Sequence, residues 1–374
     1  MNDSSFKRLG RNVLAPTVLV LFSAACGGDD GDSAEGFPIQ TESEDDTQAM
    51  ETADEESSSS STTGDGDGDG DGDGDGDGFS CPPGLEGQTP ELDGLSFDLV
   101  ATPPDDGYPE PGAFEILEGP VWADGKLYVS HIAGGGPPPK ARILTLDGAT
   151  LQPFVADAGT NGLAVDAAGH LVVARHLDGS ISRLALDDPQ TLTPWVDGYQ
   201  GERFNSPNDL CISSAGHLYF SDPNWQAPNP NPQADERAYF VLDGGEVTAF
   251  ADEVDKPNGV MLSLDESTLY VGGTNGLFAY ALDASGAPVG PGNAIAGVNG
   301  GVDGIGKDCA GNLYVTANGQ VVVLSPDDQV LGSVPLSGLT NIAFGGPART
   351  TLYATTLENP GVHALELSIP GFPY

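Results

Sequence analysis

One pattern of apolar and polar positions recurs six times between residues 118 and 354. Each copy begins with a polar residue, continues through a short apolar alternation and a polar turn, and ends in a second apolar run. The first residues of the copies, here called the anchors, lie 43, 47, 50, 45 and 38 residues apart and are Glu118, Asn161, Asn208, Asn258, Asp303 and Asn341. A repeat of about 40 to 50 residues with several short strands indicates one propeller blade per copy. We therefore expect an all-β fold, a six-bladed β-propeller.

All six anchors carry a side-chain oxygen, and two of them are carboxylates. The innermost strand of each blade lines the central channel of a propeller, so equivalent positions of the repeats converge on one axis. A ring of carboxylate and amide oxygens suits a hard divalent cation. In a single repeat, Asn, Asp and Gly beside a strand merely start a turn. Six oxygen-bearing anchors in register favour the cation site over that simpler interpretation.

The first 26 residues have the features of an export signal. Three basic residues, Lys7, Arg8 and Arg11, precede an apolar run at 13–25 that is too short to span a bilayer as a helix. The run ends in Ser-Ala-Ala-Cys, which resembles the lipobox of bacterial lipoproteins with Cys26 as the lipidated residue. We expect an exported lipoprotein at the periplasmic or outer cell surface, with ordinary secretion as the alternative.

Residues 27–96 form the next segment, a linker and lead-in rich in Asp, Gly and Ser. Its part at 27–80 holds nineteen Asp or Glu and no Lys or Arg. Such a composition buries too little apolar surface to offset the entropy of ordering, so we expect a disordered acidic tether. The remaining chain, 97–374, has the length of one closed propeller, and we expect it to be a monomer.

The propeller segment is also acidic, because 36 Asp or Glu stand against ten Lys or Arg after residue 80. Binding to nucleic acid through charge is therefore excluded, and contact with a membrane is expected only through the N-terminal lipid. Three cysteines remain after Cys26, an odd number for an oxidising compartment. We predict a Cys81–Cys309 disulfide and a buried, unpaired Cys211. No Cys-x-x-Cys or paired His spacing indicates a structural zinc site.

The sequence motifs do not indicate catalysis by a nucleophilic side chain. There is no Gly-x-Ser-x-Gly elbow, and the five His residues are scattered along the chain. Hydrolysis assisted by a metal ion held on the channel oxygens is what the residue types permit.

Six short motifs, in this order along the chain, resemble the regucalcin/gluconolactonase family. They span essentially all of 115–360 and are Glu118-Gly119-Pro120, 203–209 (RFNSPND), Ser221-Asp222-Pro223, Lys256-Pro257-Asn258-Gly259, Asp303-Gly304-Ile305 and 340–346 (TNIAFGG). The resemblance implies a six-bladed propeller with a divalent ion in its channel and lactone-hydrolysing activity.

The resemblance also implies roles for single residues. Glu118, Asn258 and Asp303 fall on the family's ion ligands, and Asn208 falls on its fourth ligand or substrate contact. Arg203 falls on its substrate-binding Arg. We expect one divalent ion, with calcium favoured and zinc, manganese or magnesium as alternatives.

The other channel positions are expected to act around this centre. Asp303 is the candidate general acid/base as well as a ligand, with a water relay as the alternative. Asn161, Asn341 and His176 are expected to line the channel or contact substrate. The sequence around His176, Ala-Arg-His, departs from the family's usual Cys-Glu-His, and a Pro/Asn-rich insertion at 224–234 is expected to overhang the channel mouth. Both features alter the substrate-facing rim.

The sequence thus predicts a metal-dependent hydrolase that opens small-molecule sugar lactones. One alternative keeps the ion but hydrolyses aryl esters or phosphotriesters. Another is a non-catalytic propeller in which the ion only stiffens the channel. Because six-bladed propellers serve many functions, the fold cannot choose among these.

Overall fold

The computed structural model describes residues 79–109, 113–134, 138–242, 244–357 and 359–373. All its regular elements are β-strands, arranged as six antiparallel four-stranded sheets. The predicted signal sequence, Cys26 and the acidic tether up to residue 78 lie outside the described residues. Within the described part, no helix is long and apolar enough to cross a bilayer.

Each sheet is one blade, and in blades 1 to 5 the strands follow chain order from the channel outward. The strands of blades 1 and 2 are β2 (Glu115–Ala123), β3 (Lys126–Ala133), β4 (Lys140–Asp147), β5 (Thr150–Val155), β6 (Thr160–Val165), β7 (Leu171–Arg175), β8 (Ser180–Leu184) and β9 (Leu192–Val196). Those of blades 3 and 4 are β10 (Leu210–Ile212), β11 (Leu218–Asp222), β12 (Arg237–Val241), β13 (Thr248–Phe250), β14 (Val260–Leu262), β15 (Thr268–Gly273), β16 (Gly276–Leu282) and β17 (Pro288–Ala294). Those of blades 5 and 6 are β18 (Val302–Lys307), β19 (Leu313–Ala317), β20 (Gln320–Leu324), β21 (Val330–Pro335), β22 (Leu339–Gly345), β23 (Thr351–Thr356), β24 (Val362–Glu366) and β1 (Asp98–Ala101).

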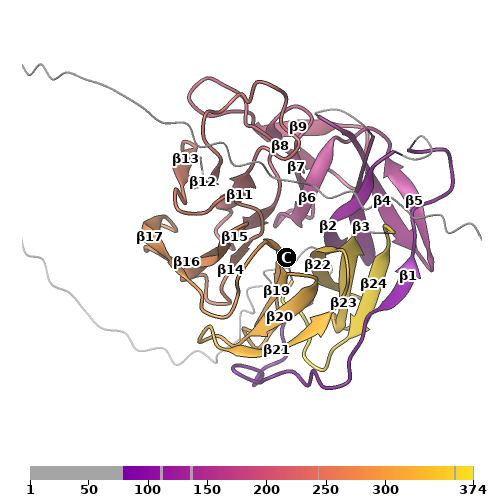
Figure 1. Ribbon diagram of the computed structural model, residues 1–374, viewed down its shortest axis with the longest axis vertical. Helices are drawn as coiled ribbons and strands as arrows, with labels where there is room; N and C mark the ends of the chain where they lie inside the picture. Colours follow the sequence, from indigo (N-terminus) through magenta and orange to yellow (C-terminus); the bar gives the residue numbers. More distant parts are fainter. Residues whose placement is uncertain (1–78, 110–112, 135–137, 243, 358, 374) are drawn as a thin grey trace, which may run out of the picture. The chain divides into compact units, whose positions relative to one another are not determined.

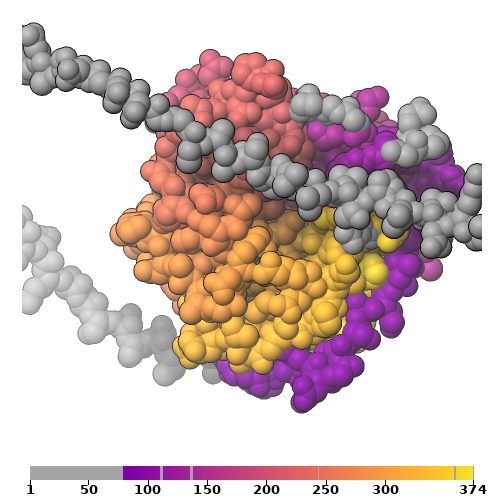
Figure 2. All heavy atoms as spheres, in the orientation of Figure 1, coloured from indigo at the N-terminus to yellow at the C-terminus, as the bar shows by residue number. Residues whose placement is uncertain are grey.

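The ring closes through the N-terminal strand, because β1 pairs with β24 as the outermost strand of blade 6. The inner strands contact one another around the ring in the order β2, β6, β10, β14, β18, β22 and back to β2. In Figure 1, β2, β6, β14 and β22 face the middle, while β5, β13, β17 and β21 lie at the rim. The space-filling view shows the same blades as abutting sectors of colour (Figure 2). The predicted six-bladed β-propeller is confirmed.

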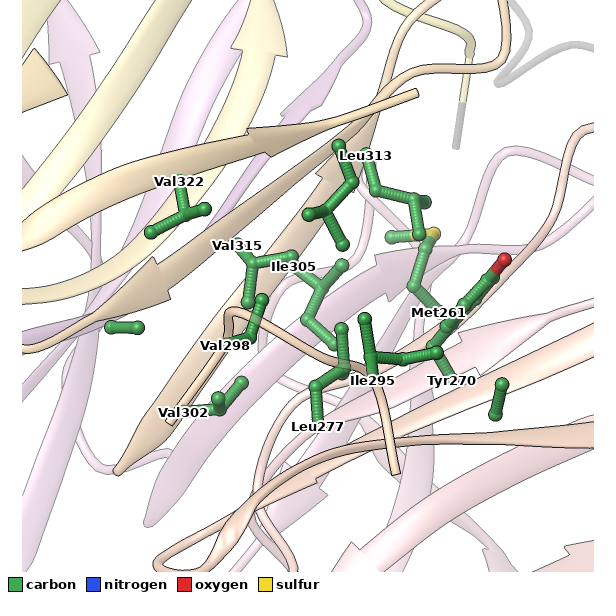
Figure 3. Close-up of a cluster of buried hydrophobic side chains, with 13 residues drawn as sticks. Met261, Tyr270, Leu277, Ile295, Val298, Val302, Ile305, Leu313, Val315 and Val322 are labelled. Atoms are coloured by element: carbon green, nitrogen blue, oxygen red, sulfur yellow. The ribbon is translucent and has the colours of Figure 1, made fainter. Parts of the chain in front are cut away.

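Six clusters of buried apolar side chains fill the six spaces between neighbouring blades. Figure 3 shows the cluster between blades 4 and 5, where Met261 and Tyr270 meet Ile305 and Val315. Strand β19 explains why the repeats carry continuous apolar runs. Its alternate side chains pack on opposite sides, with Val315 toward blade 4 and Tyr314 toward blade 6.

The lead-in before the first strand is held against the propeller rather than free. Leu92, Leu95 and Phe97 pack against the cluster between blades 5 and 6. The predicted Cys81–Cys309 disulfide is present, with Cα atoms 5.5 Å apart, and Cys211 is buried and unpaired as expected. The ordered part of the chain therefore begins before residue 97, because a covalent bond and three apolar side chains fix the lead-in.

Removing this disulfide should destabilise the fold without changing it. The bond spans 228 residues of sequence, so it constrains most of the unfolded chain. We expect the double variant Cys81→Ser/Cys309→Ser to lose about 3 kcal/mol of unfolding free energy. That loss corresponds to a Tm lower by roughly 8 °C in thermal denaturation.

The control for this prediction is the same denaturation in dithiothreitol. Reductant should lower the Tm of the wild type toward that of the double variant and leave the double variant unchanged. A wild-type Tm that reductant does not move would contradict the prediction.

Candidate functional site

Each inner strand is irregular where its anchor lies. The pairing register shifts between Glu118 and Val121 in β2, with equivalent shifts in β6, β18 and β22. In blades 3 and 4 the anchors Asn208 and Asn258 stand two residues before the regular strand begins. A bulge re-aims a side chain away from the strict in-and-out alternation of a strand. Because the inner strands start irregularly, the anchor side chains do not have to join the apolar packing between the blades.

Neighbouring anchors are brought together by very close backbone contacts. The N–H of Gly162 donates a 2.6 Å hydrogen bond to the carbonyl of Asn208 in the next blade. A Cβ on Gly259 would overlap the carbonyl oxygen of Asp303, and one on Gly304 would overlap the side chain of Asn341. Only glycine beside the anchor allows this approach. The structure thus brings residues from successive repeats to one region of the channel.

Three carboxyl groups from three blades share this region. Burial raises the pKa of Glu118 well above its usual value, and the charges of Asp303 and Asp209 raise it further. Burial also raises the pKa of Asp303 to about 8, with a second contribution from Asp209, opposed by a hydrogen bond from Asn258. Burial raises the pKa of Asp209 to about 7. The three groups are close enough to oppose one another's ionisation, which is the arrangement that a cation relieves.

Several polar side-chain atoms at this point have no hydrogen-bond partner among the described residues. They are Oδ1 of Asp303, Oδ1 of Asn258, and Oδ1 and Nδ2 of Asn161. A buried polar atom without a partner costs about 1 to 3 kcal/mol, so such a group calls for a ligand. In the described residues, no three His, Cys, Asp or Glu side chains form a ready-made metal cluster. The donors that fit a cation here are two carboxylates completed by amide oxygens, which is a set suited to a hard ion.

Two cavities lie at opposite ends of the inner strands. One, of about 230 Å³, is lined by Asn258 and Asp303 together with Trp225 and Lys256. The other, of about 130 Å³, is lined by Asp209, by Asn341 and by the far ends of β14 and β18. The first cavity gives a small molecule access to the anchors that carry unpartnered oxygens, so it is the candidate active-site cavity.

Arg203 is fully engaged with the backbone around it. Its guanidinium donates hydrogen bonds at 3.0 Å to the carbonyls of His176, Leu177 and Phe204, and a longer one of 3.4 Å to that of Asn205. These bonds tie blade 2 to the segment that leads to the anchor of blade 3. Its predicted contact with substrate stays a prediction.

His176 is buried and neutral. Burial lowers its pKa to about 4, and its Nε2 lies 3.0 Å from the carbonyl of Pro139. Because Nε2 must then carry the proton, Nδ1 is an unprotonated acceptor, and it has no partner among the described residues. Its role in substrate binding stays a prediction.

Asp209 is the site residue that the sequence reasoning missed. Its Oδ1 accepts the N–H of Leu210 at 2.9 Å, and its Oδ2 lies 3.4 Å from Nδ2 of Asn341. The position after the anchor is glycine in four of the other copies, so an aspartate there was a visible signal. Only the ring geometry shows that this side chain lies beside the anchors of blades 1, 5 and 6.

Known proteins that are similar to this chain include two lactonases and a solved gluconolactonase structure. The gluconolactonase of Zymomonas mobilis is 32% identical over 219 residues, which cover 52% of this chain and 60% of that protein, less than two thirds of its length. Pentonolactonase XacC of Haloferax volcanii is 27% identical over 261 residues, covering 65% of this chain and 82% of that protein. Among solved structures, the gluconolactonase XC5397 from Xanthomonas campestris superposes with a TM-score of 0.60 at 27% identity, over 75% of this chain and 99% of that one.

A sequence profile described as the SMP-30/gluconolactonase/LRE-like region matches residues 116–358, which contain all six anchors. The chain therefore belongs to the SMP-30/gluconolactonase/LRE-like family.

Proposed function

We propose that this protein hydrolyses sugar lactones where the anchors meet in the channel. A divalent cation would be held there by Glu118, Asn208, Asn258 and Asp303. The observation that carries the proposal is the meeting of buried, mutually repelling carboxyls with unpartnered amide oxygens. Two of those anchors, Asn258 and Asp303, line a cavity. The similarity to gluconolactonases supports a lactone as the substrate.

The cation is proposed on the chemistry of its donors. Carboxylate and amide oxygens favour calcium, and magnesium or manganese are the closest alternatives. Zinc more often takes nitrogen or sulfur ligands, which this ring does not offer. A divalent cation bound here supplies Lewis-acid polarisation of the lactone carbonyl and stabilises the negative charge that develops on its oxygen.

The protein's own groups have separate tasks. Asp303 lines the cavity, and its Oδ1 has no hydrogen-bond partner in the part of the chain that the structure describes, so we assign this carboxylate to accepting the proton of the attacking water. It returns that proton to the ring oxygen when the ester bond breaks. The backbone N–H of Asn208 donates to the carbonyl of Ser221, and its carbonyl accepts the N–H of Gly162, so the backbone that carries this side chain is fixed. We assign the side chain of Asn208 to orienting the carbonyl group of the substrate.

The first test of this function is the variant Asp303→Asn. The amide keeps the shape of the side chain but cannot take up a proton, so kcat/KM for δ-gluconolactone should fall by about 100-fold or more. The assay is base consumption in a pH-stat, corrected for spontaneous hydrolysis. Asp327→Asn is the matched control, because Asp327 is exposed in a turn of the same blade.

Two outcomes would count against the proposal. Retention of more than half of the activity in Asp303→Asn would remove Asp303 from the reaction. A wild-type rate no higher than the buffer rate, with each of calcium, magnesium, manganese and zinc, would favour the non-catalytic propeller.

A second prediction concerns stability and needs no substrate. Without a cation, the folded protein holds protons on Asp209 and Asp303, whose pKa values of about 7 and 8 lie above the unfolded value of 3.8. The unfolded chain releases these protons at lower pH, so the contribution of this pair to stability falls as pH rises from about 4 to about 8. Cation binding removes the repulsion, so stabilisation by calcium should be larger at pH 8 than at pH 5.

The measurement is Tm in EDTA and in excess calcium at both pH values. Calcium at 100 times its Kd stabilises by about 2.7 kcal/mol, which should raise Tm by roughly 7 °C at pH 8. The double variant Glu118→Gln/Asp303→Asn keeps the acidic tether but should lose this shift. An equal calcium shift in wild type and double variant would assign the ion to the tether or the surface instead.

We also propose that the protein is exported and anchored by lipid on Cys26, as its N-terminal sequence indicates. The Cys81–Cys309 disulfide supports an oxidising compartment. In the native host, Cys26→Ser should abolish incorporation of labelled fatty acid and move the protein from the membrane to the soluble fraction. Unchanged labelling in this variant would refute the anchor.

A further inference from the structure

The insertion at 224–234 between β11 and β12 is fixed to the segment that leads to Asn208. The side chain of Asn205 accepts the N–H of Gln233 at 2.9 Å and donates to the carbonyl of Asp235 at 3.0 Å. Ser206 Oγ accepts the N–H of Gln226 at 3.2 Å. The insertion is therefore bound at both of its ends to the stretch that ends in a predicted cation ligand.

Trp225 stands in this insertion at the wall of the active-site cavity. It shares the lining of that cavity with Asn258 and Asp303, and 41% of its surface is exposed. The ammonium of Lys256 lies 4.6 Å from the centre of the indole ring. An aromatic side chain that stays exposed at a cavity wall, although the insertion that carries it is bound at both ends, is a feature that calls for a ligand.

Lys256 holds the indole rather than offering its charge to a substrate. Its Nζ lies 3.0 Å from Oε1 of Glu236 and also bonds to the side chain of Asn224, the neighbour of Trp225. Lys256 is therefore already paired, and the other charged group that lines the cavity is the carboxylate of Asp303. Among the described residues of this lining, a negatively charged substrate finds no unpaired cationic side chain.

The rest of the lining combines the polar side chains of Thr274, Thr316 and Asn318 with the apolar side chains of Val302, Ala317 and Leu339. An aromatic face in the same cavity as hydroxyl and amide groups matches a sugar ring, which has an apolar C–H face and a rim of hydroxyls. We propose that Trp225 is a specificity-determining residue, the platform on which the ring of a neutral, non-phosphorylated sugar lactone packs. Lys256 is the positioning residue of that platform. This inference rests on the proposed lactone hydrolysis at the same site.

The test compares Trp225→Ala and Trp225→Phe with the wild type on δ-gluconolactone. Loss of the aromatic face should raise KM about tenfold and leave kcat within twofold, because Trp225 contacts the ring and not the reacting bond. The phenyl ring should keep KM within about threefold of the wild type. Val289→Ala, an exposed position on the outer strand β17, is the control for a general surface effect.

The substrate class is tested by 6-phosphogluconolactone, which the wild type should hydrolyse with a kcat/KM at least tenfold lower than that of gluconolactone. An unchanged KM in Trp225→Ala would overturn the platform, and so would a phenyl variant as weak as the alanine variant. A higher kcat/KM for 6-phosphogluconolactone than for gluconolactone would overturn the proposal that the substrate is a neutral lactone.

Binding of 1,5-anhydroglucitol, a sugar ring that cannot be hydrolysed, tests the platform separately from the lactonase activity. The platform predicts that this ligand changes the tryptophan emission of the wild type and not that of Trp225→Phe. This change without any lactone turnover would refute the hydrolase and keep the platform. Conversely, lactone turnover without a change in tryptophan emission, together with an unaltered KM in Trp225→Ala, would refute the platform and keep the hydrolase.

Discussion

The repulsion among three carboxyl groups is the constraint around which this propeller is organised. Glu118, Asp209 and Asp303 come from three blades; Glu118 and Asp209 are buried and Asp303 is half-buried, so the charged form of each is unfavourable. Their proximity is maintained by the apolar clusters between the blades, where each fully buried Val, Leu or Ile contributes about 1.5 to 3 kcal/mol. Packing far from the axis thus offsets an electrostatic cost at the axis, and a bound cation would remove that cost.

The sequence was sufficient for the architecture because every blade repeats the same local pattern. Each inner strand needs a polar anchor, and four of the six have glycine beside it, so the period and the anchors can be seen without coordinates. The disulfide was also predictable, since only one pairing joined the lead-in to a turn between strands. Closure of blade 6 by β1 was not, because that pairing joins the two ends of the domain and has no local signal.

The site was predicted less completely for a related reason. The sequence identifies which side chains are anchors, but not what their neighbours do. The guanidinium of Arg203 donates hydrogen bonds to four backbone carbonyls, and these bonds depend on loops of blade 2 that fold beside it. Asp209 is adjacent to Asn208 in sequence, yet its significance comes from carboxyls 91 and 94 residues away, at Glu118 and Asp303. Contacts of this kind appear only when the ring is closed.

The residues near the channel axis and those of the insertion at 224–234 differ in how far they tolerate substitution. Near the channel axis, Gly259 and Gly304 face the next blade so closely that any side chain would displace Asp303 or Asn341. Among the described residues, the insertion at 224–234 forms hydrogen bonds to the loop before Asn208 and to Lys256, and none to an anchor. A different residue at 225 would therefore change what packs in the cavity while the carboxyls keep their positions. Substrate choice in this protein can be altered at the rim without disturbing the centre that would activate the ester.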